Sequence, residues 1–351
     1  MTKTINKFGK PSVDIAGIKD FLIDENDELI KGDRQINEIY ISQKKRKSCK
    51  NCDGKIEGID FYKQNIPYSI CSVCGHLNGL FEDSDEFCKI AYQGSGKDDY
   101  KKNYMETNFE KFNKRVKSIY QPKAKFLIDS LKKDKKTQEL NSSFCDVGAG
   151  LGYFIKALNL EGQSNVKGFE VSKENVNLAN EILKNNSVEY YEIKDTLKTI
   201  KSINSEVVSM IGVLEHLQDP ISILKTIKEN KFIKYIYLSV PIFGPSVFFE
   251  ILSPNTFHRQ LSRDHTHLYT NESLEWLCKN TGFDRVSEWW FGQDMMDLYR
   301  HILVHAKKNN ELSVKASDLF KSMLSPIIDS LQLTIDKQKL SNEIHLLLKK
   351  N

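Results

Sequence analysis

The fold of this chain is decided by the run Phe144-Cys145-Asp146-Val147-Gly148-Ala149-Gly150-Leu151-Gly152-Tyr153. Its first residues are apolar except for one carboxylate, which predicts a short buried strand. The alternating glycines that follow predict a tight turn, because a residue without a Cβ lets the backbone come close to a ligand. A helix is expected to begin near Tyr153 and to aim its unpaired N–H groups at the turn. The run therefore predicts a strand, turn and helix that bind a ligand.

A second carboxylate, Glu170, strengthens that prediction. It ends the next apolar segment, Val166 to Phe169, and an acid at about twenty residues after the turn can accept hydrogen bonds from both hydroxyls of a ribose. Dinucleotides and S-adenosylmethionine share this arrangement. Asp146 favours S-adenosylmethionine, because a carboxylate repels the pyrophosphate of a dinucleotide and attracts the ammonium group of S-adenosylmethionine. The residues expected to hold S-adenosylmethionine here are Asp146, Gly148, Gly150, Gly152, Tyr153 and Glu170.

These residues, with the string Val213-Leu214-Glu215-His216-Leu217-Gln218-Asp219-Pro220, make the chain similar to class I S-adenosylmethionine-dependent methyltransferases. The resemblance covers roughly residues 120–300. It implies an α/β fold with a Rossmann-like, doubly wound sheet of seven strands, the last of which is antiparallel to its neighbours. The alternation of strands and helices after Phe144 independently predicts a parallel sheet, with the ligand beyond the carboxyl ends of its strands.

Two further residues are candidates for the same site. Asp195 follows Val188 to Ile193, the expected third strand, and could accept a hydrogen bond from the adenine amino group. An ordinary loop aspartate is nearly as favoured there. Residues 91–136 are polar and mostly compatible with helix, and we interpret them as a helical linker or lid. In related methyltransferases a tyrosine-rich stretch in this place folds over the cofactor, so the resemblance implies that Tyr104 lies near the sulfonium.

Four of the seven cysteines form the pairs Cys49-x-x-Cys52 and Cys71-x-x-Cys74. Two such pairs at this separation are typical of a tetrahedral zinc site, and four thiolates fill its coordination shell, so the metal is expected to be structural. Disulfides are the alternative, which a reducing cytosol disfavours. We interpret residues 49–90 as a zinc ribbon with short strands at 58–62 and 68–70. Residues 1–48 are interpreted as an extension with limited core.

The acceptor is expected near a long irregular stretch from Pro241 to Thr270, which closes with Arg263-Asp264-His265-Thr266-His267-Leu268-Tyr269-Thr270. A segment beyond the carboxyl end of a strand lies over the transferred methyl group, and an acid beside a histidine can orient the ring. The string resembles the acid-histidine segment of sugar and surface-polysaccharide methyltransferases. That resemblance implies a general base among the candidate catalytic residues, which are His265 with Asp264 as its partner, His267 as a substitute, and His216. A structural histidine is the alternative at each position.

The carboxyl-terminal part of the chain completes the expected methyltransferase domain, residues 137–351. Ile344 to Leu348 is interpreted as the final antiparallel strand, and Ile302 to Val304 competes for that place. Residues of about 293–340 have helical periodicity and are interpreted as a helical insertion. Such helices could cover the acceptor pocket or pair two copies of the chain in a homodimer.

Composition limits the function classes. The net charge of +4 on 351 residues gives no strong field for nucleic acid, and no apolar stretch is long enough to cross a bilayer. The amino terminus lacks the apolar centre of a secretion signal, so a cytoplasmic protein is expected.

The preferred function is methyl transfer to a small molecule, a sugar or a nucleotide-linked sugar of surface-polysaccharide biosynthesis. An RNA methyltransferase is the alternative, suggested by the zinc ribbon and the basic residues from Lys44 to Lys50. The chain lacks the Asn-Pro-Pro-aromatic string with which many base methyltransferases grip a flipped base, which disfavours RNA. A third possibility, a protein that binds zinc and S-adenosylmethionine without catalysis, is disfavoured because the expected binding residues are all present.

Overall fold

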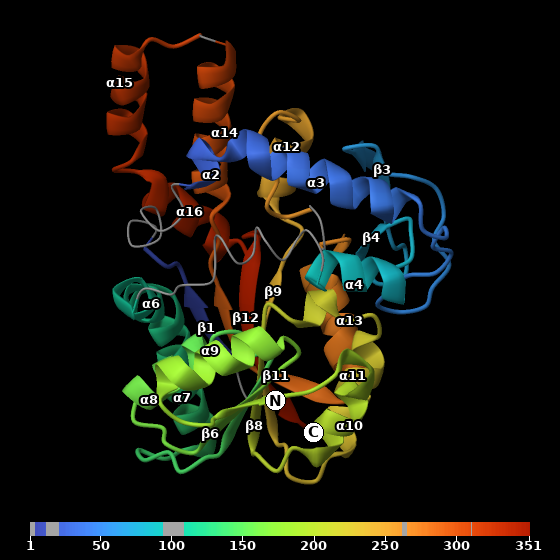
Figure 1. The fold of residues 1–351 in the computed structure, drawn as a ribbon, viewed down its shortest axis with the longest axis vertical. Helices are drawn as coiled ribbons and strands as arrows, with labels where there is room; N and C mark the ends of the chain where they lie inside the picture. Colours follow the sequence, from blue (N-terminus) through green and yellow to red (C-terminus); the bar gives the residue numbers. More distant parts are fainter. Residues whose placement is uncertain (1–3, 12–20, 94–108, 262–264, 310) are drawn as a thin grey trace.

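Buried apolar segments form the middle of the larger of two sheets. Strands β5 (Phe144–Val147), β8 (Val207–Ile211) and β9 (Tyr235–Pro241) lie side by side and parallel. Both faces of these strands are covered, which is why their sequences are almost continuously apolar. The computed structural model describes residues 4–11, 21–93, 109–261, 265–309 and 311–351. Figure 1 shows helices packed on both sides of this sheet.

Within the described ranges, the larger sheet has eight strands in the order β1-β11-β12-β9-β8-β5-β6-β7. Its other members are β1 (Ile5–Phe8), β6 (Val166–Glu170), β7 (Val188–Tyr190), β11 (Phe283–Trp290) and β12 (Glu343–Lys350). Strand β12 runs antiparallel to both β11 and β9, as predicted for the final strand. The strand order reverses between β5 and β8, which is where an open sheet of this kind binds its ligand.

The expected count of seven strands is wrong by one, because β1 adds to the edge of β11. Ile5 pairs with Ser287 and Phe8 pairs with Trp290, in parallel. The Lys7 ammonium lies 3.7 Å from the centre of the Trp289 ring. The Trp289 indole N–H donates to the carbonyl of Gly9 at 2.9 Å, across 280 residues of sequence. A four-residue strand held by such distant partners has no periodicity of its own that would predict it.

Helices cover the two faces of the large sheet. One face carries α6 (Phe109–Arg115), a π-helical segment η1 (Val116–Tyr120), α7 (Gln121–Lys135), α8 (Tyr153–Leu160) and α9 (Lys173–Leu183). The other carries α10 (Thr196–Ser202), α11 (Pro220–Glu229) and α13 (Asn271–Thr281). Helix α11 begins after a cap at Asp219, whose side chain accepts a hydrogen bond from the Ser222 N–H, and Pro220 follows at the first helical position.

The smaller sheet joins the cysteine-bearing segment to the large domain. Its strands are β2 (Phe61–Lys63), β3 (Ile66–Ile70), β4 (Leu77–Gly79) and β10 (His267–Leu268), with β10 paired antiparallel to β4. Helices α3 (Asn26–Ile41) and α4 (Asp85–Gln93) pack on this sheet, and the short helix α2 (Phe21–Asp24) precedes α3. Tyr40 of α3 is buried in one core cluster with Leu77 of β4 and Leu268 of β10.

The stretch expected to be irregular between Pro241 and Thr270 contains helix α12 (Pro245–Leu252). Pro245 stands at the start of this helix, where its missing N–H costs no hydrogen bond, and Val247 is fully buried in the cluster around Tyr40. The prediction of an irregular stretch is therefore wrong for residues 245–252, which are helical.

Three helices lie between β11 and β12 in sequence. They are α14 (Asp294–Asn309), α15 (Val314–Leu324) and α16 (Ile328–Lys337). The competing strand at Ile302 to Val304 lies inside α14 and is not a strand. Figure 1 shows α15 and the adjoining end of α14 projecting from the rest of the molecule. In the part of the chain that the structure describes, no helix combines the length and the apolarity that crossing a membrane requires.

Candidate functional site

The glycine turn has the backbone that its sequence predicts. Gly148, Gly150 and Gly152 all have positive φ values, of 76°, 53° and 76°. A Cβ on Gly148 would lie 2.6 Å from Cγ2 of Val213, and one on Gly152 would lie 2.7 Å from Cδ1 of Leu183. Both the conformation and the close packing therefore require glycine at these two positions. The contact with Val213 also joins the turn to the segment that follows β8.

Glu170 closes the turn from the neighbouring strand. One oxygen of its buried carboxylate accepts the Gly150 N–H at 2.9 Å, and the other accepts the Ser172 N–H at 2.9 Å. Burial raises the pKa of this carboxyl, and the backbone N–H groups oppose that rise. An ionised carboxylate offers about four acceptor positions, so Glu170 keeps acceptor capacity for a ligand's hydroxyls.

Asp146 is buried on β5 and faces β8. Its Oδ1 accepts a hydrogen bond from the Ser209 hydroxyl at 2.5 Å, and the two residues are register partners on adjacent strands. Burial raises the pKa of Asp146 to about 7, and the charge of Glu170 adds to that rise against the Ser209 bond. A cation bound nearby would stabilise the ionised form. Ser209 was not singled out from the sequence, although a hydroxyl in the apolar run of β8 is a visible signal.

The structure also places Tyr153 and Asp195, two further residues that are predicted to bind the ligand. The buried ring of Tyr153 stacks between Phe112 and Tyr120, with centroid distances of 4.7 and 5.1 Å. It therefore contributes to packing between α8 and the preceding helices. Asp195 is half-buried and ends a short 3₁₀ turn, η2 (Ile193–Asp195).

Tyr104 lies outside the described residues. Tyr191, which the sequence did not single out, lies close enough to Glu170 that burial and the Glu170 charge raise its pKa to about 12.

After β8 the structure brings together Glu215, His216 and His265. One ligand atom from each lies within 4.8 Å of the others, and the centroids of the two imidazole rings are 5.1 Å apart. Glu215 and His216 belong to a 3₁₀ turn, η3 (Leu214–His216), directly after Val213. The predicted pair of histidines thus meets at the carboxyl end of β8, beside the glycine turn. Glu215 was not predicted as a site residue, although it is part of the quoted string.

The nitrogen atoms of His265 are distinguishable. The Gln260 carbonyl lies 3.1 Å from Nδ1 of His265, and because a carbonyl can only accept, Nδ1 carries the proton in this contact. The other nitrogen, Nε2, is then the basic one in the neutral ring. Asp264, the predicted partner of His265, lies outside the described residues.

His267 is not placed for proton exchange with a ligand. Its ring is 2% exposed, with Nε2 at 2.8 Å from the Glu215 carbonyl and Nδ1 at 2.8 Å from Nε2 of His76. Burial lowers the pKa of His267 well below 6.5, and the charge of Lys50 lowers it further. The neutral ring therefore donates to Glu215 and accepts from His76. His267 links the two sheets at β10, which the sequence did not indicate.

The four paired cysteines converge as a metal site requires. The Sγ atoms of Cys49 and Cys74 are 3.7 Å apart, and those of Cys52 and Cys71 are 3.5 Å apart. Thiolates bound tetrahedrally to zinc at about 2.3 Å are about 3.8 Å from one another. The backbone N–H of Asn51 and the amide of Asn78 donate to the Cys49 sulfur at 3.4 and 3.5 Å. The donor set, spacing and supporting hydrogen bonds therefore fit one zinc ion.

Among the described residues, two groups have the composition of metal ligands, the four cysteines and the trio Glu215, His216 and His265. The cysteine group suits a closed structural site. The trio contains a carboxylate and imidazoles, which can hold a divalent cation or exchange a proton with a ligand.

Comparison with known proteins gives a family and one curated relative. Residues 112–288 match the model of a family described as "methyltransferase domain". The ubiquinone biosynthesis O-methyltransferase of Actinobacillus pleuropneumoniae serotype 5b (strain L20) is 28% identical over 141 residues, which are 36% of this chain and 60% of that protein. The match thus spans about three fifths of the relative's length.

Solved structures with a similar fold include two methyltransferases. Magnesium protoporphyrin IX methyltransferase (ChlM) from Synechocystis PCC 6803, with bound SAH, has a TM-score of 0.46 and 11% identity over 76% of this chain and 100% of that one. The plantazolicin methyltransferase BamL, in complex with a triazolic desmethylPZN analog and SAH, has a TM-score of 0.45 and 13% identity over 75% of this chain and 94% of that one. Similarities at this level do not bear on the substrate.

Proposed function

This chain belongs to the methyltransferase domain family, whose model matches residues 112–288, and from that premise we propose that it transfers a methyl group from S-adenosylmethionine to a hydroxyl of a small molecule. The acceptor class we propose is a sugar or a nucleotide-linked sugar. The observation that carries the proposal is the meeting of Glu215, His216 and His265 within 4.8 Å, next to a turn built of positive-φ glycines.

The donor end is formed by backbone and two carboxylates. Glu170 holds the turn through the Gly150 N–H and keeps acceptor positions for the ribose hydroxyls. Asp146, held by Ser209, offers its charge to the ammonium group of the amino acid portion. Positive φ at Gly148 and Gly152 keeps the backbone of the turn open to the ligand. S-adenosylmethionine, when bound, supplies a methyl group that its sulfonium already activates.

His265 takes the proton of the acceptor. Its Nδ1–H donates to the Gln260 carbonyl, which leaves the Nε2 lone pair for the hydroxyl proton. His265 would hold this proton while bound S-adenosylmethionine would give its methyl group to the acceptor oxygen and keep the electron pair of its broken sulfur–carbon bond. The carboxylate of Glu215, within 4.8 Å, stabilises the positive charge that develops on the imidazole. A neutral amine acceptor would not need this group, which is why we favour a hydroxyl.

Two cations of the basic run are used inside the protein, which favours a small acceptor over RNA. The Lys50 ammonium and the Arg46 guanidinium bind Asp83 at 2.5 and 3.1 Å, whereas Lys44 forms an exposed pair with Glu82 at 3.5 Å. Charges that are neutralised inside the protein are not free to bind phosphates. This arrangement favours a structural role for Arg46 and Lys50.

The test is the substitution His265→Asn with His305→Asn as its matched control. His305 stands on α14 with its side chain 59% exposed and belongs to no part of the proposed site. We expect the first variant to lose turnover by roughly a hundredfold or more, the scale of general base catalysis, and to keep its affinity for S-adenosylhomocysteine. Turnover of nucleotide sugars with labelled donor at the control's level would remove His265 from the mechanism.

The proposal includes one structural zinc ion held by Cys49, Cys52, Cys71 and Cys74. Four thiols this close are costly to ionise together without a cation. Elemental analysis of the purified protein should find one zinc per chain, and a Cys71→Ser, Cys74→Ser variant should contain none. Protein that is folded, active and free of zinc would contradict this part.

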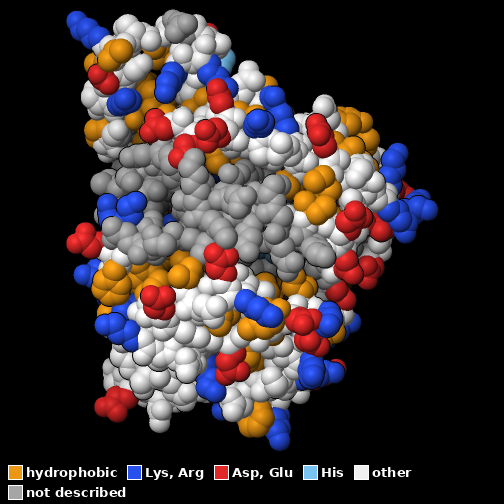
Figure 2. All heavy atoms as spheres, viewed as in Figure 1, with side chains coloured by type: hydrophobic (Ala, Val, Ile, Leu, Met, Phe, Trp, Pro, Cys, Tyr) orange, Lys and Arg blue, Asp and Glu red, His pale blue; other side chains and the backbone are white. Residues whose placement is uncertain are grey.

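The C-terminal helices are proposed as the contact of a homodimer. Leu319 and Met323, four residues apart on one face of α15, have exposed fractions of 57% and 65%, and Figure 2 shows apolar side chains at the surface of this projecting part. Such a face is normally covered by a partner. Light scattering should give twice the chain mass, and Met323→Lys should give a monomer. A monomer at all concentrations for the unaltered chain would contradict it.

A further inference from the structure

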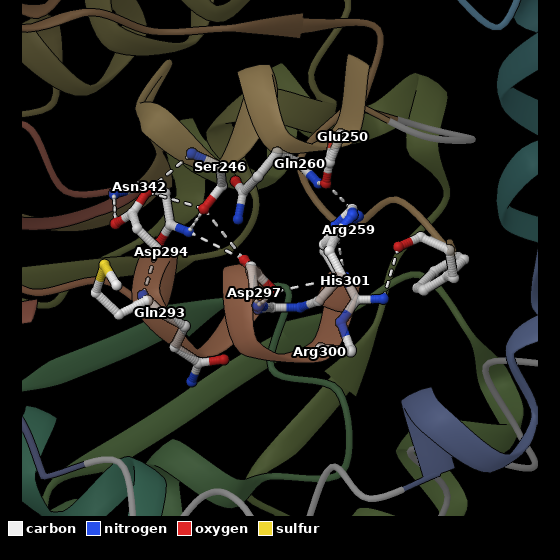
Figure 3. Close-up of polar contacts among 12 residues, drawn as sticks. Ser246, Glu250, Arg259, Gln260, Gln293, Asp294, Asp297, Arg300, His301 and Asn342 are labelled. Carbon is white, nitrogen blue, oxygen red and sulfur yellow. Dashed lines mark hydrogen bonds and ion pairs between the residues drawn. The ribbon is translucent and has the colours of Figure 1, made fainter. Parts of the chain in front are cut away.

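A buried carboxylate on α12, Glu250, determines where the peptide before His265 lies. Its exposed fraction is 0%. The Arg259 and Gln260 N–H groups donate to Oε1 at 2.5 and 2.7 Å, and the Leu261 N–H donates to Oε2 at 3.3 Å. Figure 3 shows this contact from α12 to the following segment. A single side chain thus fixes three consecutive peptide groups.

A lysine from the cysteine-bearing module, residues 49–90, balances the charge of Glu250. The ammonium of this residue, Lys63 on β2, lies 3.2 Å from Oε2 and is itself buried. The same ammonium donates to the carbonyl of Leu261. Burial alone would raise the pKa of Glu250, but Lys63 and the backbone N–H groups lower it to about 2. The carboxylate is therefore ionised, and its hydrogen bonds are charge-assisted.

The peptide unit between Gln260 and Leu261 connects Glu250 to His265. The unit that joins Gln260 and Leu261 is planar and trans, as are the other peptide bonds of the described residues, so its N–H and C=O point in opposite directions. The N–H is held by Glu250, and the C=O lies 3.1 Å from Nδ1 of His265. Glu250 thereby presents to His265 an acceptor that selects the tautomer with the proton on Nδ1.

The C-terminal helices hold the same segment from the other side. The Arg259 guanidinium donates to both oxygens of Asp297 on α14, at 2.9 and 3.1 Å. The Arg300 guanidinium, also on α14, donates to the Phe257 carbonyl at 2.8 Å. These contacts are drawn in Figure 3. The segment that leads to His265 is thus fixed by both the amino-terminal module and the helices after β11.

The residue after His265 is also anchored. The Thr266 hydroxyl donates to Asp83 at 2.7 Å, and the Gly79 N–H donates to the Thr266 carbonyl at 2.9 Å. Asp83 and Gly79 both belong to the segment that continues from the cysteines. His265 therefore lies between two anchored points of the chain.

We propose that Glu250 is a positioning residue for methyl transfer, which acts through the Gln260–Leu261 peptide to hold His265 as the Nδ1–H tautomer with Nε2 free to accept a proton. This inference rests on the proposed function for the role of the proton, but the tautomer itself does not depend on that role. Glu250 touches no substrate in this account. The cysteine module then serves the catalytic domain by orienting its base.

The first test needs no variant at the positioning residue. The chain has eight histidines, and ¹⁵N-labelled histidine spectra of the full-length, zinc-loaded protein resolve ring tautomers. The signal that disappears in His265→Asn identifies His265. We expect its neutral ring to carry the proton on Nδ1. A proton on Nε2 would overturn the inference, whatever the turnover of His265→Asn shows.

The second test is Glu250→Gln, which keeps the shape of the side chain and removes its charge. Glu206→Gln is the control, because Glu206 also binds a lysine, Lys135, at 2.7 Å. It accepts in addition from the Ser142 hydroxyl at 2.9 Å and lies away from residues 257–266. We expect Glu250→Gln to increase the Nε2–H tautomer of His265. Its kcat should fall by roughly ten- to a hundredfold, as for a small misplacement, with unchanged donor affinity.

Glu250→Gln and Glu206→Gln could lose similar thermal stability while the tautomer of His265 and kcat stay unaltered in both. That result would show that Glu250 is only structural and would overturn the inference. An unchanged turnover of His265→Asn together with the expected tautomer shift in Glu250→Gln would instead contradict the proposed function and leave the positioning intact. The two failures are therefore distinguishable.

Discussion

The donor half and the acceptor half of the proposed site are built in different ways. The donor half is local, because Asp146, the three glycines and Glu170 lie within 25 residues of one another and interact through backbone. The acceptor half depends on contacts between Lys63 and Leu261, Asp83 and Thr266, and His76 and His267, which are 198, 183 and 191 residues apart. Substitutions elsewhere in the chain should therefore leave the donor half intact. They should disrupt the acceptor half, because it depends on contacts between distant residues.

Removal of the proposed zinc ion should give the largest difference between the two halves, because it should abolish turnover and leave donor binding intact. A structural zinc site of four cysteines contributes on the order of 10 kcal/mol to folding of its module, and β4 of that module pairs with β10 next to His265. We expect a chelator to abolish turnover and to raise hydrogen exchange at residues 265–268. Calorimetry with S-adenosylhomocysteine should still detect donor binding. Equal loss of donor binding and turnover would show that the halves are not independent.

Gly148→Ala should damage the donor half alone. The new Cβ would lie 2.6 Å from Val213 at a φ of +76°, and strain of this kind costs about 1–3 kcal/mol. Gly162→Ala is the control, because Gly162 has a φ of +83° and nothing within 4 Å of its added Cβ. Donor affinity should fall more than tenfold in the first variant and stay unchanged in the second. Equal thermal destabilisation of both, without an effect on binding, would contradict the assignment of the turn.

The charge of Asp146 should make donor binding depend on pH. Its pKa is raised from 3.8 to about 7, with burial as the largest cause. The folded chain then keeps a proton that the unfolded chain releases, so Asp146 increasingly destabilises the fold as pH rises from about 4 to about 7. Above pH 7 the ionised carboxylate can bind an ammonium group. Donor affinity should rise roughly tenfold from pH 6 to pH 8, and Asp146→Asn should lack this rise. Parallel profiles for the two proteins would exclude Asp146 from the ammonium contact.

The same contrast explains what could be predicted from the sequence. The glycine turn, the Asp219 cap and the antiparallel β12 were predictable because each depends on neighbouring residues or on one periodic segment. Strand β1 was not, since its partner lies at the other end of the chain. Helix α12 was not predicted, although Pro245 marks its start.

For the candidate site, residue type alone was not enough. His265 and His216 were expected in one place and meet there. His267 looked equivalent by sequence, but it lies on β10, where its ring is buried against His76. Tyr153 stays a predicted ligand-binding residue, and its ring packs on Phe112. Glu250 and Lys63 could not be paired from the sequence, because nothing in either segment indicates the other.

The most direct test of the account is a calorimetric titration of S-adenosylmethionine into zinc-loaded protein, beside the variant Glu170→Gln. We expect one binding site per chain, and a loss of affinity of roughly ten- to a hundredfold in the variant, because hydrogen bonds to an ionised carboxylate contribute about 1.5–3 kcal/mol. Absence of binding to the unaltered protein, or equal affinity in the two proteins, would contradict the donor site on which the proposed function rests.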